Sequence, residues 1–259
     1  MKTKMKALTL ALCAVMLVAT TVFVTVAFLT DKSDVVKNTF TVGKVDIILD
    51  EAKVEQYGDP VDASGKVITD KMTITDAEGK TKEVLDYTKA PRVLENTYKL
   101  LPGLDYVKDP TVQVKTDSEK CYVRMMVTVT VPAAAADKIG TDLTNIVTGH
   151  DENIWVRKNQ TVTPGADATA PTVIVYEYRY NGIVDAYTLP AGYEADYGKL
   201  PALFTGITVP DDYDNATIEA LAGLKIDVVA HAIQSAGFTA TDIFATAEDA
   251  AWNAFDNQK

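Results

Sequence analysis

Residues 121–131 read Cys-Tyr-Val-Arg-Met-Met-Val-Thr-Val-Thr-Val, and this stretch decides the fold class. One face of an extended segment would carry Val123, Met125, Val127, Val129 and Val131. The opposite face would carry Tyr122, Arg124, Met126, Thr128 and Thr130. A period of two in a segment rich in β-branched residues is typical of a strand with one buried face. Pro132 cannot donate to a sheet ladder, so we expect the strand to end at Val131.

Three further segments, 111–115, 173–180 and 224–233, alternate in the same way and are also predicted to be strands. In the second of them one face carries Ile174, Tyr176, Tyr178 and Tyr180. Aromatic stripes of this kind can bind glycans, but on a strand they are more often packing between sheets.

Helical composition is confined to short stretches between and after these strands. Residues 133–146 carry apolar side chains three and four positions apart, and 215–221 is predicted to be a short helix. Residues 239–255 also have an apolar face, and Thr241 is placed to cap that helix at its N-terminus.

Residues 53–97 have the composition of an insertion. Two turn-forming clusters, 62–66 and 76–80, predict one or two polar hairpins there. Segments 159–171 and 185–214 are rich in proline, glycine and aspartate and are interpreted as loops. Many strands with occasional helices in the connections indicate an all-β, mainly antiparallel two-sheet sandwich, rather than a parallel α/β sheet.

The N-terminus has the organisation of an export signal. Three lysines precede an uncharged, mostly apolar run over residues 7–29, and Thr-Val-Ala ends at Ala27. We therefore predict a signal peptide over residues 1–27 and cleavage between Ala27 and Phe28. The mature chain, 28–259, would form a single domain. Because the apolar run is long enough to span a bilayer, an uncleaved membrane anchor is the alternative.

Charge and cysteine content narrow the function classes further. The formal net charge is −11, and removal of the three N-terminal lysines would make it −14. Such an acidic chain is a poor partner for nucleic acid. Cys13 would leave with the signal, unless it were acylated as in a lipoprotein. Cys121 would then be the single cysteine, interpreted as a small buried hydrophobe or else as an intermolecular disulfide partner.

The sequence holds no recognisable catalytic or cofactor motif. His150 and His231 lie far apart without a metal-ligand spacing, and no glycine-rich phosphate loop or GxSxG motif is present. We therefore expect no enzymatic activity and no cofactor. The carboxylates between Asp211 and Asn215 suit either a Ca²⁺ site or a solvated turn that caps the next helix.

Several stretches resemble one known family. Their residues are Ala27-Phe28-Leu29-Thr30-Asp31, Asn38-Thr39-Phe40-Thr41-Val42-Gly43-Lys44-Val45, Leu101-Pro102-Gly103 with Lys108-Asp109-Pro110-Thr111-Val112, Cys121-Tyr122-Val123-Arg124, and Val228 to Phe238 (VVAHAIQSAGF) with Trp252 following. In order and spacing they resemble the TasA/camelysin family of exported Firmicute matrix proteins, whose precursors are processed by a SipW-type signal peptidase.

The resemblance implies a jelly-roll-like β-sandwich and an extracellular structural role as a fibre subunit or biofilm-matrix component. In such fibres the N-terminal segment of one subunit completes the sheet of the next. Camelysin has been described as a protease, but no protease motif is found here. The insertion at 53–97 departs from the shorter members of the family.

The residues after the predicted cleavage site suit strand donation. Residues 28–49 carry apolar side chains on a polar-punctuated tether, namely Phe28, Leu29, Val35, Val36, Phe40, Val42, Val45 and Ile47. Such a segment can add to an open sheet edge and place alternate side chains in pockets. It would make the protein a homo-oligomer or filament. Pairing as an edge strand of its own domain is one alternative. Another is a membrane-anchored surface module that recognises a glycan or host protein through the loops at 185–214.

Overall fold

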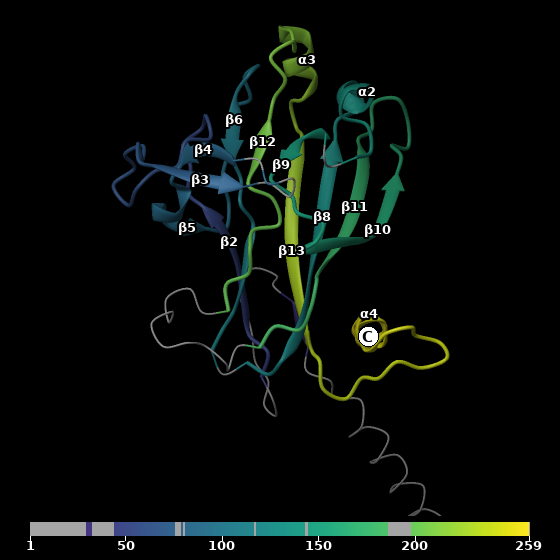
Figure 1. Cartoon of the computed structure of the whole chain (residues 1–259). Coiled ribbons are helices and arrows are strands. Elements are labelled where there is room, and N and C mark those ends of the chain that lie inside the picture. Colours follow the sequence, from purple (N-terminus) through teal and green to yellow (C-terminus); the bar gives the residue numbers. More distant parts are fainter. Residues whose placement is uncertain are drawn as a thin grey trace, which may run out of the picture.

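The computed structural model describes residues 30–32, 44–75, 79, 81–116, 118–142, 145–185 and 198–258. These residues form an all-β, mainly antiparallel sandwich with a few short helices in its connections, as the strand patterns predict (Figure 1). A five-stranded central sheet makes one layer, and smaller sheets make the other.

The central sheet has the strand order β1-β13-β8-β11-β10, and every neighbouring pair is antiparallel. Its strands are β1 (Thr30–Lys32), β13 (Lys225–Gln234), β8 (Cys121–Val131), β11 (Thr172–Tyr180) and β10 (Trp155–Thr163). The prediction of a strand over residues 121–131 is confirmed at both ends, and those over 173–180 and 224–233 are confirmed to within one residue.

The opposite layer is divided into two three-stranded sheets and a hairpin. One sheet has the order β5-β2-β7 and consists of β5 (Arg92–Val93), β2 (Ile47–Ala52) and β7 (Thr111–Val114). The other has the order β6-β12-β9 and consists of β6 (Asp105–Val107), β12 (Gly206–Thr208) and β9 (Val147–Thr148). The hairpin is β3 (Lys71–Thr75) with β4 (Thr81–Leu85), whose antiparallel pairing confirms a hairpin in the predicted insertion.

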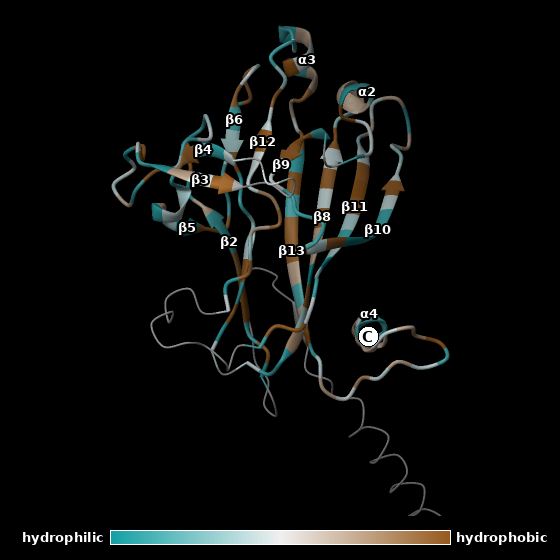
Figure 2. Cartoon of the chain, viewed as in Figure 1, coloured by the Kyte–Doolittle hydropathy of each residue, from teal (hydrophilic) through white to brown (hydrophobic). Residues whose placement is uncertain are grey.

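The main core lies between the layers. Figure 2 shows hydrophobic and hydrophilic residues alternating along β8 and β13. The predicted apolar face of β8 is buried, since each of its five residues is at most 1% exposed. Val112 and Val114 of β7 pack on it from the opposite layer, and so do Tyr176 and Tyr178 from the neighbouring strand. The tyrosine stripe is therefore core packing, as its position on a strand predicts.

The helices are shorter than the sequence patterns suggest. α3 (Asn215–Ala220) is confirmed. Helix α2 (Ala136–Ile139), which follows the 3₁₀ turn η2 (Ala133–Ala135), ends where Gly140 adopts a φ of 67°. The helical composition of residues 133–146 therefore does not form one continuous helix.

The last helix, α4 (Ala247–Asp256), is capped by Thr246 and not by Thr241. The hydroxyl of Thr241 instead accepts backbone hydrogen bonds from Ile243 and Phe244 in a turn. The prediction of a helix start at residue 239 is wrong because that turn satisfies the same backbone donors that a helix cap would satisfy.

The prediction of a loop at 159–171 is wrong up to Thr163, because β10 continues through an exposed and polar segment.

The insertion at 53–97 also contains the 3₁₀ turn η1 (Tyr87–Lys89). It has a small apolar cluster in which Ile68 and Ala90 pack against Ala52 of β2. This cluster holds the insertion against β2 of the sandwich.

Candidate assembly site

A short strand close to the predicted cleavage site forms one edge of the central sheet. Thr30 pairs with Ile233, Asp31 with Ala232, and Lys32 with His231. β13 is a ten-residue strand, and β1 covers only three of its residues. The alternative in which this segment serves as an edge strand of its own domain is therefore realised in the structure, over three residue pairs.

Among the described residues, no strand forms a ladder with residues 225–229 on the side of β13 that faces away from β8. Residues 225–229 pair with β8 on one side, and on the other side no described residue forms a ladder or backbone hydrogen bond with them. Ile226 and Val228 pack against the main core, so this part of the strand is held firmly in place. An edge of this kind presents backbone donors and acceptors to an added strand.

The opposite edge of the central sheet, β10, is built differently. Its register against β11 shifts between Arg157 and Asn159, which marks an irregularity of the β-bulge type. Its residues from Arg157 to Thr163 are exposed and polar or charged, apart from Val162. Bulges and charged side chains discourage the addition of further strands. The edge formed by β1 and β13 is therefore the better candidate for assembly.

The predicted assembly residues divide into two groups. The first group lies outside the described residues and consists of Phe28, Leu29, Val35, Val36, Phe40 and Val42; the predicted cleavage residue Ala27 lies outside them as well. Val45 and Ile47 are buried in the main core, and β2 pairs with β7 in the opposite layer. The structure thus assigns the last two predicted anchors to the core of their own subunit, and among the described residues of the segment it brings β1 to the β13 edge.

The outer face of the central sheet, which points away from the main core, carries helix α4. Arg124 of β8 donates two hydrogen bonds to the carboxylate of Asp256, at 3.0 and 2.5 Å. Its guanidinium lies 4.5 Å from the ring centroid of Trp252 and 5.0 Å from that of Phe255. Ion pairing and cation–π contacts together hold the helix against the sheet. In Figure 1, α4 lies beside the central sheet, away from β2 and β5.

A second arginine holds the other end of α4. Arg179 of β11 donates to Glu177 on its own strand and to Asp249 of α4, both at 2.7 Å. This role of the two arginines was not predicted from the sequence. Two features of the sequence could have indicated it. Both arginines lie on the polar faces of predicted strands, and an amphipathic segment rich in acidic residues lies near the end of the chain.

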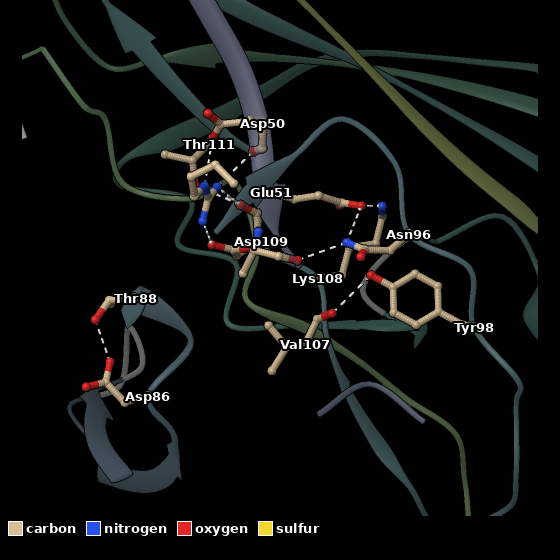
Figure 3. A network of polar contacts seen from close by, with 12 residues as sticks. Asp50, Glu51, Asp86, Thr88, Asn96, Tyr98, Val107, Lys108, Asp109 and Thr111 are labelled. Atoms are coloured by element: carbon tan, nitrogen blue, oxygen red, sulfur yellow. Dashed lines mark hydrogen bonds and ion pairs between the residues drawn. The ribbon is translucent and has the colours of Figure 1, made fainter. Parts of the chain in front are cut away.

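A second polar network joins the insertion to the sandwich (Figure 3). Arg92 bonds to Asp50 at 2.8 Å and to Asp109 at 2.5 Å, and Asp109 accepts from the backbone of Ala52. Burial raises the pKa of the Asp109 carboxyl, although the charge of Arg92 opposes the shift. Every charged group named here has a partner, so the network is best understood as a structural lock.

Lys108 and Tyr98 complete that region. Lys108 bonds to Glu51 at 2.8 Å, and Glu51 also accepts from Asn96. Tyr98 donates to the carbonyl of Val107 at 3.0 Å. Asn96 also donates to the backbone carbonyl of Ala52, so the end of the insertion is tied to β2.

The other residues that the sequence marked as candidates for chemistry have structural roles in the fold. Cys121 is fully buried, and burial raises the pKa of its thiol to about 12, as expected of a small hydrophobe. His231 accepts from Nε of Arg124 at 3.2 Å and packs on Phe255. Asp214 caps α3 by accepting from the backbone of Thr217, which confirms the capped-turn interpretation of the acidic cluster.

The described part of the chain holds no group of three or more histidine, cysteine, aspartate or glutamate side chains placed to bind a metal ion. It also holds no helix of the length and apolarity that a bilayer span requires. Comparison of the chain with protein-family models, with curated proteins and with solved structures found no match.

Proposed function

We propose that the chain is an exported structural subunit that assembles head to tail. In the assembly, the N-terminal segment of one copy takes the place of β1 on the β13 edge of the next copy. The observation that carries the proposal is the three-residue pairing of β1 with β13 at the edge of the central sheet. Strand addition of this kind is heterologous and does not close on itself, so it propagates into filaments.

Strand exchange would preserve the pairing that β1 makes. A donor from a second copy would make the same main-chain contacts that β1 makes within its own subunit. A donor that continued the β1 register along residues 225–229 would place Val35 opposite Val228. Each net hydrogen bond of such a ladder would contribute about 1 kcal/mol to holding the donor, and these bonds would oppose the entropy lost when two copies associate.

The sequence supports the remaining parts of the proposal. The lysine-flanked apolar leader supports export, and cleavage after Ala27 would leave Phe28 at the start of the donor. The resemblance to the TasA/camelysin family supports processing by a SipW-type signal peptidase and an extracellular matrix or fibre role. The acidic composition suits a protein that stays soluble outside the cell until it assembles.

A first test examines assembly directly. Residues 28–259 are expressed with Phe28 as the native N-terminus and inspected for filaments by electron microscopy over a range of concentration, salt and pH. A variant that lacks residues 28–37 serves as the comparison. We expect filaments from the first protein and none from the second. Undiminished polymerisation of the shortened chain, or a strictly monomeric full-length protein, would contradict the proposal.

A second test asks whether the strand crosses between subunits. Lys32→Cys and His231→Cys variants are made separately, mixed and oxidised, because these two residues lie directly opposite in the observed register and position 231 is not buried in the main core. Directly paired residues have Cα separations compatible with a disulfide. A mixed dimer on a non-reducing gel is expected, whereas the pair Lys32→Cys with Asp227→Cys should give little. Buried Cys121 should stay unreactive in both mixtures.

A further inference from the structure

We infer that helix α4 acts as a clamp on the β13 edge: its docking on the outer face sets how firmly the end of β13 holds an N-terminal strand. Two attachments coincide near the end of β13. Residues 231–233 of β13 pair with β1 through their backbone, and the side chains of His231 and Ile233 contact α4. The same short segment therefore carries both attachments.

The apolar part of the clamp is compact. Ile233 forms a buried cluster with Ala251, Trp252 and Phe255 of α4, and each of these four side chains is at most 3% exposed. The rings of His231 and Phe255 are 4.9 Å apart between centroids. With α4 docked, β13 is covered on its outer face at the very residues that receive β1.

The polar part of the clamp spans the sheet. Arg124 lies directly opposite His231 in the β8–β13 ladder and bonds to both His231 and Asp256. On the next strand, Arg179 lies opposite Arg124 and bonds to Asp249. Helix α4 is thereby attached to three neighbouring strands, and the attachment immobilises the end of the sheet where β1 is bound.

The clamp is separable from the rest of the fold. Its apolar cluster is distinct from the main core between the layers. The chain reaches α4 through residues 235–246, which carry an Ile243 side chain that is 83% exposed. Small packed units of this kind open locally without global unfolding. Undocking would leave Arg124 without Asp256 and expose Ile233 and Tyr122, so the end of β13 would fray and β1 would lose its partner.

The test compares two substitutions on the same helix. Trp252→Ala removes the central clamp side chain, whereas Asn253→Ala alters an exposed neighbour. Hydrogen–deuterium exchange followed by mass spectrometry is measured on the protein as the producing cell makes it. With Trp252→Ala we expect exchange of the amides in β1 and in residues 231–233 to rise by about tenfold or more, without a matching rise in β10 and β11. Asn253→Ala should leave all four regions unchanged.

A second variant separates clamp loss from general damage. Asp256→Asn keeps the size of the side chain and the helix, and it should raise exchange in the same two segments by a smaller factor. Exchange at β1 that equals the unmodified protein in both clamp variants would overturn the inference. A uniform rise over the whole central sheet would also overturn it.

That the clamp regulates assembly rests on the proposed function. The hydrogen–deuterium exchange experiment tests the clamp independently of that function. If clamp variants loosen β1 and no variant forms filaments, the clamp stands and the assembly proposal fails. If filaments form at an equal rate with Trp252→Ala and with the unmodified protein, and β1 exchange is also unchanged, assembly stands and the clamp fails.

Discussion

Arg124 on β8 and Asp256 on α4 form a two-pronged ion pair across 132 positions of sequence. The two partners differ in environment, since the Arg124 side chain is 5% exposed and that of Asp256 is 54% exposed. A buried cation is thus neutralised from the surface by a helix that sits at the end of the chain. Glu177, 3.5 Å from Arg124, is the other carboxylate in reach among the described residues.

Replacing Asp256 with asparagine should lower the free energy of unfolding by about 1 kcal/mol, because it removes a charge-assisted pair whose acidic partner is partly exposed. Urea denaturation measures the change. Asp227→Asn, an exposed substitution on the outer face of β13, should have an effect within about 0.5 kcal/mol. Equal effects of the two substitutions would mean that the pair contributes no measurable stability.

Docking of α4 should weaken in acid. The hydroxyl of Thr246, together with Arg179, lowers the pKa of Asp249. Burial alone would raise the pKa of Asp256, but the bonds and charge of Arg124 outweigh it and lower that pKa. Lowered carboxyl pKa values mean that docking is fully stabilised above the ordinary aspartate pKa of about 4 and is lost as the pH falls below it.

The two tryptophans make this measurable. With fluorotryptophan incorporated, Trp155 in the core and Trp252 in the clamp should give separate ¹⁹F resonances. The Trp252 signal is expected to change below about pH 4 while the Trp155 signal stays native. An Asp249→Asn, Asp256→Asn double variant should show no such step. A step centred near pH 6 would point to a histidine and contradict the carboxylate explanation.

Strands were predicted well from the sequence where one face of the strand is buried and the other is not. Residues 121–131 are buried on one face only, so the alternation along them is regular and both ends are marked. β10 was missed because it is an edge strand: apart from Trp155, which is buried, and the half-buried Val156, its side chains are exposed. Solvent on both sides removes the alternation that identifies a strand.

The clamp was harder to predict than the strands because it depends on distant pairing. Arg124 and Arg179 are recognisable as polar-face residues of strands, but nothing local indicates that their partners lie on a C-terminal helix. For α4, the apolar spacing extended across residues 239–246, where hydrogen bonds to Thr241 form a turn instead. Local pattern identified that a helix exists, and tertiary contacts decided where it begins.

Removing the Asp109 carboxylate should be among the most destabilising single changes. Asp109→Ala would leave Arg92 half-buried without its closest partner and the backbone N–H of Ala52 without an acceptor. We expect a loss of about 3–5 kcal/mol, the range for breaking a buried ion pair from one side. Asp70→Ala removes a 66% exposed carboxylate paired with Lys89 and should cost less than about 1 kcal/mol. Thermal unfolding of both variants checks the contrast, and similar losses would rule out a structural lock at Arg92.

Gly198 and Gly65 provide a matched test of backbone packing against β7. Gly198 has a φ of 64°, and a Cβ there would lie 1.9 Å from the carbonyl oxygen of Val114. Its own carbonyl accepts from the Val114 backbone at 2.8 Å, so a shift to relieve the clash would break that bond. Gly65 has a φ of 84°, but a Cβ there meets nothing within 4 Å.

Both alanine substitutions therefore carry the strain of the left-handed region, about 1 kcal/mol, and only Gly198→Ala adds a steric clash. We expect Gly198→Ala to lower the free energy of unfolding by roughly 2–4 kcal/mol and Gly65→Ala by about 1 kcal/mol. Urea denaturation of the two variants side by side measures the difference. Equal losses would show that β7 yields to the added methyl group, and the contact between residue 198 and Val114 would then contribute little to the rigidity of this sheet.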